Sequence, residues 1–190
     1  MTTPGTYRES DESAVTSADA LVAWVAEARP ALERTARIYR ATITYKELSE
    51  EVQAASGIRT RRLLQYWIGD VLGTVSHDCN ESGEPLLSAL CVRSDGSVGP
   101  GYAIAVAENL GGDQPDDLDM HAAEERLRCY RYFGADLPLD GGTPALTKQV
   151  AAARLRARRR VSAPLADESR PICPNCFLML PVSGQCDNCS

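Results

Sequence analysis

Several common signatures are missing from this sequence of 190 residues. Aromatic residues make up only 6% of it, so we expect an aliphatic core. No run approaches the roughly 18 apolar residues that a membrane span needs. The N-terminus also lacks the cationic start and apolar stretch of a secretory signal. These absences predict a cytoplasmic protein without a membrane partner, in which thiols stay reduced and paired cysteines bind metal.

Recognisable catalytic motifs are also missing. The sequence has no clear Ser/His/Asp set, phosphate-binding glycine loop or paired-carboxylate motif, and it indicates no small-molecule substrate. The formal net charge of −6 argues against a surface coated in positive charge. The charge is unevenly spread, however, because residues 148–160 carry six cations and no acid. A local basic segment of this kind favours contacts with phosphate groups.

The chain ends with two Cys-x-x-Cys pairs separated by nine residues. Two such pairs can direct four thiolates at one ion, which is the closed arrangement of structural zinc sites. A segment of about twenty residues cannot bury enough apolar area to fold alone, so metal binding would supply the free energy. Disulfides, a redox Cys-x-x-Cys, a frayed tail and an iron site of the same geometry are the alternatives. The expected ligands of Zn²⁺ are Cys173, Cys176, Cys186 and Cys189.

The last twenty residues resemble the short zinc-ribbon family. Pro174 stands in the usual place of a Cys-Pro-x-Cys knuckle, whereas Phe177 replaces the glycine that usually follows. We expect Asn175 and Asn188 to adopt positive φ in the two knuckles, because asparagine tolerates that conformation. The resemblance implies a structural ion and a role in docking DNA, RNA or protein.

The middle of the sequence predicts a short helix followed by a long one. Thr44 and Glu47 fit a capping box, and Gly57 is expected to end the short helix that follows them. Thr60 is expected to cap the long helix over residues 61–80, where apolar residues recur at helical spacing. Further helices are expected over three segments, the first of them kinked or split by a proline: 18–40, 118–133 and 146–160.

A β-hairpin is expected after the long helix. Asp95-Gly96 is a strong turn signal between the β-prone segments 86–93 and 97–106. Helix, helix and hairpin in this order predict an α+β fold, a winged helix-turn-helix-like domain with a C-terminal zinc ribbon. The expected regions are a disordered leader (1–17), the winged-helix-like domain (18–145), an Arg-rich helical connector (146–170) and the zinc ribbon (171–190).

DNA is the partner that this arrangement predicts. A winged helix places the start of its second helix against base edges and phosphates, and its hairpin against the adjacent backbone. The residues expected to contact DNA there are Arg59, Arg61, Arg62, Gln65, Arg93 and Ser97. A solvated helix start is the alternative, although arginines at that position oppose the helix dipole. A basic arm follows towards the C-terminus, and it comprises Arg154, Arg156, Arg158, Arg159 and Arg160. This arm either grips phosphates or is a solvated helix end.

Residues 41–133 are similar to the DNA-binding domain of O6-alkylguanine-DNA alkyltransferases and alkyltransferase-like proteins. The similarity is carried by TYKELSEEV, IRTRRLLQYWIGDVL and LLSALCVRSDGSVGPGY. The family shows Thr-Tyr-x-x-Leu-Ala, an arginine-bearing helix, a Pro-Cys-His-Arg-Val-Val strand and a wing ending in a Gly-Tyr-like step. The resemblance implies that Tyr45 lies beside a target nucleotide. It also implies that Arg61 or Arg62 fills the gap left by a flipped base.

The same comparison argues against catalysis. The family's Cys-His-Arg falls on Ser88, Ala89 and Leu90, so the nucleophilic thiol and its activating histidine are missing. Cys91 lies three positions late, on the opposite face of an alternating strand. The sequence therefore predicts no enzyme but a non-catalytic, zinc-containing DNA-binding protein, regulatory or accessory to DNA modification, repair or phage-related processes. The alternative is an adaptor that docks protein partners through the same two modules.

Overall fold

The computed structural model describes residues 5–109, 112, 115–162, 172–180 and 184–189. The chain divides into two compact units, Met1–Ala152 and Ala153–Ser190. The division falls inside the basic helix, and not at residue 145 where we expected the first domain to end. In the described part of the chain, none of the helices has both the length and the apolar character needed to cross a membrane.

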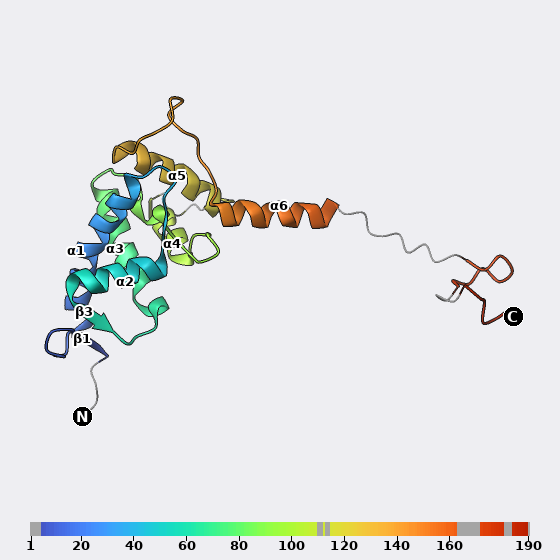
Figure 1. The fold of residues 1–190 in the computed structure, drawn as a ribbon, viewed down its shortest axis with the longest axis horizontal. Helices are drawn as coiled ribbons and strands as arrows, with labels where there is room; N and C mark the ends of the chain where they lie inside the picture. Colours follow the sequence, from blue (N-terminus) through green and yellow to red (C-terminus); the bar gives the residue numbers. More distant parts are fainter. Residues whose placement is uncertain (1–4, 110–111, 113–114, 163–171, 181–183, 190) are drawn as a thin grey trace. The chain divides into compact units, whose positions relative to one another are not determined.

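The first unit is α+β, as expected, with helices and two small two-stranded sheets. Figure 1 shows β1 and β3 at the lower edge of this unit. The antiparallel pair β1–β3 sets Tyr7 opposite Arg59, and the parallel pair β2–β4 sets Ile43 opposite Cys91. The elements in chain order are β1 (Thr6–Arg8), α1 (Ser17–Ala36), β2 (Ile43–Thr44), α2 (Tyr45–Ser56), β3 (Ile58–Thr60), the 3₁₀ turn η1 (Leu64–Tyr66), α3 (Ile68–Glu81), the 3₁₀ turn η2 (Leu87–Leu90), β4 (Cys91–Val92), α4 (Pro100–Asn109), α5 (Leu118–Tyr132) and α6 (Lys148–Ser162).

Helix α1 lies against α2 and α3 and buries its apolar face there. Pro30 lies inside this helix without splitting it, contrary to one of our expectations. The core is mainly aliphatic, as the composition predicts, and its aromatic members include two tryptophans whose ring centroids are 4.3 Å apart, Trp24 and Trp67. The Trp24 indole also donates a buried hydrogen bond of 3.1 Å to the carbonyl of Ile58. This bond ties α1 to β3.

Helix α2 begins with the predicted capping box. The Thr44 hydroxyl accepts from the amide of Glu47 at 3.2 Å, and the Glu47 carboxylate accepts from the amide of Thr44 at 2.8 Å. These bonds satisfy donors that an uncapped helix start would leave unpaired, and they lower the pKa of Glu47. Gly57 then ends the helix in the left-handed conformation, with φ of 65°. The predicted limits of this helix are confirmed.

The leader that we expected to be disordered is ordered from Gly5 onward. Residues 6–8 form β1, and the amide of Val15 donates a hydrogen bond of 3.0 Å to the carbonyl of Thr6. The polar composition of the leader concealed this pairing, because β1 is stabilised by backbone bonds to the exposed edge of β3 and not by its own apolar residues.

The single long helix predicted over residues 61–80 was wrong. The chain stays extended through β3, passes through η1, and enters α3 only at Ile68. Thr60 does not cap a helix. Its amide donates to the Gln53 side chain at 2.9 Å and its hydroxyl donates to the carbonyl of Gly5 at 3.1 Å. Pairing with β1 therefore removes the first turn that the sequence pattern suggested.

The prediction of a β-hairpin was also wrong, although the turn predicted at Asp95-Gly96 is present. The amide of Gly96 donates to the carbonyl of Arg93 at 2.9 Å, and the amide of Arg93 donates to the carbonyl of Ser97 at 2.8 Å. The chain does not return as a second strand, however, because α4 begins at Pro100. Proline suits the first turn of a helix, where its missing amide hydrogen costs no bond.

The bond between Trp24 and Ile58 generates a stability prediction. We expect Trp24→Phe to lower the free energy of unfolding by about 1–3 kcal/mol, because the Ile58 carbonyl loses its buried donor. Urea denaturation measures this change. Val22→Ala on the exposed face of the same helix, where Val22 is 72% exposed, should change it by less than about 0.5 kcal/mol. Equal midpoints for wild type and Trp24→Phe would contradict the role given to this bond.

Candidate metal centre and binding pocket

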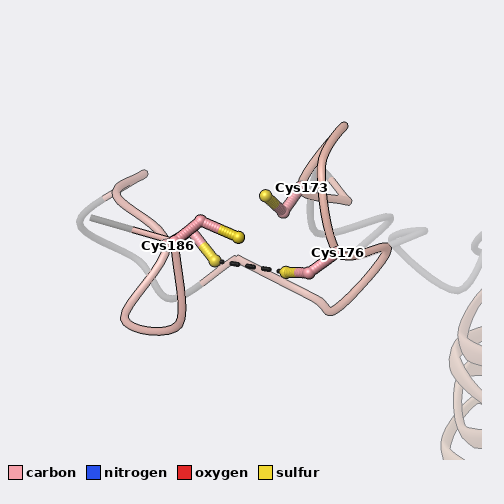
Figure 2. A group of neighbouring side chains, drawn as sticks. Cys173, Cys176 and Cys186 are labelled. Atoms are coloured by element: carbon pink, nitrogen blue, oxygen red, sulfur yellow. Dashed lines mark hydrogen bonds between the residues drawn. The ribbon is translucent and has the colours of Figure 1, made fainter.

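The four predicted ligands lie together in the second unit. The sulfur atoms of Cys173, Cys176, Cys186 and Cys189 all lie within 4.8 Å of one another. Figure 2 shows the first three side chains converging, and the sulfurs of Cys176 and Cys186 are 3.4 Å apart. This separation is far longer than the roughly 2.05 Å of a disulfide. It is close to the ~3.8 Å between ligands of a tetrahedral ion with Zn–S bonds of about 2.3 Å. The cluster therefore has the geometry of a four-thiolate metal site.

The backbone of the first knuckle builds half of this site. The amide of Phe177 donates to the carbonyl of Cys173, and the amide of Cys173 donates to the carbonyl of Leu178, each at 2.9 Å. Backbone amides of Cys176 and Asn175 donate to the Cys173 sulfur and lower the pKa of that thiol to about 6. Cys173 therefore favours the thiolate form at neutral pH, which is the form that binds metal.

The fourth cysteine shows why these sulfurs need a cation. A hydrogen bond shared with the Cys176 sulfur raises the pKa of Cys189 to about 12. Four thiolates this close repel one another unless a positive ion lies between them, and a coordinated thiol loses its proton outright. Ion binding should therefore release protons and weaken as the pH falls.

The left-handed residue in the first knuckle is Phe177, with φ of 58°. Asn175 and Asn188 do not adopt positive φ, so that expectation was wrong. The left-handed position follows the second cysteine of the knuckle, which is the place where the zinc-ribbon family usually has glycine. A residue with a Cβ pays about 1–2 kcal/mol in this conformation.

A second candidate site is a cavity of about 510 Å³ in the first unit. It brings together three of the residues predicted to contact DNA, Tyr45, Gln65 and Arg93. They come from the start of α2, from η1 and from the turn after β4, and the remaining lining is mainly apolar. Its size falls within the range of small-molecule pockets, about 300–1,000 Å³.

Tyr45 forms one wall of this cavity because the capping box starts α2 at that residue. Its side chain is partly buried, and this burial raises the pKa of its hydroxyl to about 12. Gly99 makes room for it, since a Cβ at Gly99 would lie 2.3 Å from the tyrosine oxygen. Tyr45 is therefore held as a neutral ring beside the cavity.

Some residues that line this cavity could not be predicted from the local sequence pattern. The hydroxyls of Ser76 and Ser88 are 2.7 Å apart and both residues line the cavity. Tyr102 lines it too, and its hydroxyl lies 2.9 Å from Nδ1 of His121. The only sequence signals were the family resemblance, which places Ser88 at the active-site cysteine, and the Gly-Tyr step at Gly101-Tyr102.

The three arginines predicted at a helix start do not line this cavity. Arg59 forms a two-pronged ion pair with Glu9, at 3.1 and 3.2 Å. The Arg61 guanidinium lies 4.3 Å from the centre of the Tyr7 ring. Both partners belong to the N-terminal segment that we had expected to be disordered.

Two further predicted contacts are engaged locally. Arg62 donates to the carbonyl of Tyr66 at 3.0 Å. The Ser97 hydroxyl donates to the Asp95 carboxylate at 2.6 Å within the turn after β4. Arg62 does not stand at a helix start, because α3 begins only at Ile68. Ser97 was expected to flank a wing, and it lies in a turn that is followed by α4 and not by a second strand.

The predicted basic arm is helical, as expected of residues 146–160. Arg154 is half-buried, whereas Arg156, Arg158 and Arg159 are exposed. Arg160 belongs to the helix, but its side chain lies outside the described part. At 100° per residue these arginines point to several sides of α6, so the helix carries positive charge around its axis.

Comparison with known proteins finds no relative. No protein-family model matches the chain, and neither a curated protein nor a solved structure matches it significantly.

The metal centre generates a prediction about composition. We expect the purified chain to carry one zinc ion, and Cys176→Ser to lose it, because three thiolates leave the tetrahedron incomplete. Elemental analysis by mass spectrometry measures the ratio of metal to protein. Cys91→Ala, which removes a buried thiol of the first unit, is the control and should keep one ion. A metal-free wild type prepared without chelator would contradict the site.

Phe177 generates a second prediction. We expect Phe177→Gly to tighten metal binding about fivefold, because relief of the left-handed strain outweighs the greater entropy of glycine in the unfolded chain by about 1 kcal/mol. Competition with a chromophoric chelator measures the affinity. Met179→Gly is the matched control, since Met179 is 70% exposed and lacks positive φ. Weaker binding by Phe177→Gly than by wild type would contradict the account of strain.

Proposed function

We propose that this chain is a non-catalytic, zinc-containing DNA-binding protein with a role accessory to DNA modification or repair. The observation that carries the proposal is the cavity lined by Tyr45, Gln65 and Arg93. These residues come from separate elements and were each predicted to touch DNA, yet they meet at one cavity. A cation, an amide and an aromatic ring beside an apolar pocket suit an unstacked base and the phosphate next to it.

Among the described residues that line the cavity there is no cysteine that could serve as the nucleophile of the alkyltransferases. Ser88 stands at the position where the resemblance places the reactive cysteine. Its hydroxyl is hydrogen-bonded to the Ser76 hydroxyl, and not to a general base that could activate it. Burial strongly raises the pKa of Cys91, which follows Ser88 by three positions in the sequence, so it is a poor nucleophile. The proposed role is therefore to hold an extruded base, not to transfer a group from it.

Helix α6 supplies the proposed contact with phosphates. It carries one lysine and five arginines and no acidic residue, in a chain whose net charge is −6. Each cation that neutralises a phosphate releases a counterion, so binding through α6 should weaken steeply as the salt concentration rises.

Zinc is the proposed ion of the four-cysteine site. Four thiolates in a closed tetrahedron are typical of structural zinc, and an iron site of the same geometry is the alternative. The ion would be bound by Cys173, Cys176, Cys186 and Cys189, where it would supply folding free energy and no chemistry.

The proposed pocket can be tested with a fluorescent base. We expect a duplex carrying 2-aminopurine to brighten on binding, because the base leaves its stack. Gly69→Phe should abolish the brightening by filling the cavity, since Gly69 lines it and a Cβ there meets nothing within 4 Å. Anisotropy of the same duplex measures binding separately, and this variant should keep affinity and salt dependence within about twofold of wild type.

Gly73→Phe is the matched control. Gly73 lies one turn further along α3, has the same open surroundings, and does not line the cavity. This variant should brighten the duplex as wild type does. Binding without brightening in wild type would overturn the base-holding role, and no binding even at low salt would overturn the DNA-binding function.

An adaptor for protein partners is the second candidate. One observation favours it, since the ribbon exposes apolar side chains that no described residue covers. The most exposed of them is Phe177 at 80%, followed by Met179, Ile172 and Leu178. The salt titration separates the two functions, because an adaptor would ignore DNA at low salt. In that case, substitution of these exposed residues should abolish partner binding while the metal stays bound.

A further inference from the structure

A second cavity of the first unit is lined by three basic residues. Its volume is about 190 Å³, and Arg40, Arg126 and Lys148 all line it. No acidic side chain is found among the described residues of this lining. The cavity is smaller than the roughly 300–1,000 Å³ of drug-sized ligands but has room for a tetrahedral oxyanion. We propose that it binds a phosphate group.

Arg126 is the main reason for this proposal. The residue is only 4% exposed, and burial lowers the pKa of its guanidinium. Two of its five N–H groups donate to backbone carbonyls, those of Ala89 and Ala145, each at 3.2 Å. Carbonyl oxygens are neutral, so these bonds orient the guanidinium without neutralising it.

The described residues provide no close carboxylate for Arg126. Asp119 on the same helix attracts the guanidinium, but it forms no ion pair with it and accepts a bond of 3.0 Å from the amide of Val98. A buried charge without a counterion is costly, and proteins usually pair such charges. An anion in the cavity would supply the missing counterion.

Two further features point to the same ligand. Lys148 lies at the first position of α6, a helix of 15 residues, so the positive end of its dipole is at the cavity together with an ammonium group. Arg40 is exposed and also lines the cavity, and its guanidinium lies 5.2 Å from the centre of the Tyr39 ring. Three residues with cationic side chains, from α5, α6 and the segment after α1, therefore line one small space.

Inorganic phosphate is the direct probe. We expect calorimetry on the full-length, metal-loaded chain, at constant ionic strength, to show saturable binding of one phosphate. Lys148→Glu should weaken it by at least about tenfold, because it places a carboxylate beside the anion. Lys46→Glu is the matched control, since Lys46 is the other lysine of the chain and its side chain is 79% exposed on α2. That control should stay within about twofold of wild type.

Variants of the buried arginine need a separate check. Arg126→Gln removes bonds to two backbone segments and can unfold the unit, so Arg40→Gln at the exposed rim provides a second reading with the fold kept. Circular dichroism verifies the fold of each variant. No saturable phosphate binding by wild type overturns the proposal, and so does equal weakening by Lys148→Glu and Lys46→Glu.

The source of the phosphate is settled by two oligonucleotides of one sequence, with and without a 5′-phosphate. Tighter binding of the phosphorylated strand, lost in Lys148→Glu, assigns the cavity to a terminal phosphate. Equal binding of both strands that is lost in Lys148→Glu assigns it to the backbone. Because the inorganic probe needs no DNA, the phosphate site can fail or stand independently of the proposed DNA-binding function.

Discussion

The pairing of β1 with β3 determines how the first unit presents its charged residues. Three backbone pairs hold residues 58–60 extended, and the Trp24 indole bonds to the same strand from the other side. Extension at that point delays the start of α3 to Ile68 and leaves Gln65 in a 3₁₀ turn at the cavity. The same pairing occupies Arg59 and Arg61 with Glu9 and Tyr7. The expected start of an arginine-headed recognition helix is therefore replaced by a strand and a 3₁₀ turn.

The second unit depends on electrostatics more than on packing. In residues 172–180 and 184–189 of this unit the apolar side chains are largely exposed, and two knuckles bring four sulfurs together. Backbone amides stabilise the thiolate at Cys173, while the crowding of sulfurs raises the pKa of Cys189. These opposite shifts describe a site that is prepared for a cation, and Phe177 shows that one backbone position is strained to build it.

The short-range features of the fold were predictable from sequence. The capping box at Thr44, the left-handed Gly57 and the turn at Asp95-Gly96 each depend on a few neighbouring residues, and all three are confirmed. The helix predicted over residues 118–133 also forms, as α5 (Leu118–Tyr132). The prediction of one long helix over residues 61–80 was wrong for a tertiary reason. The apolar pattern of a helix is present, but β1 pairs with the chain just before the expected first turn, and β1 lies about fifty residues away in the sequence. The hairpin failed because β-prone residues after Pro100 are equally compatible with a buried helix.

The sequence by itself determined the four-cysteine centre and the basic helix, because ligand spacing and charge are written in residues close together in the chain. Only the tertiary structure decided which arginines are engaged, which residues share the cavity of Tyr45, and where Arg126 is buried. Those features depend on contacts between segments far apart in the sequence. Such contacts form through backbone hydrogen bonds and burial, and these leave no periodic signal in any one segment.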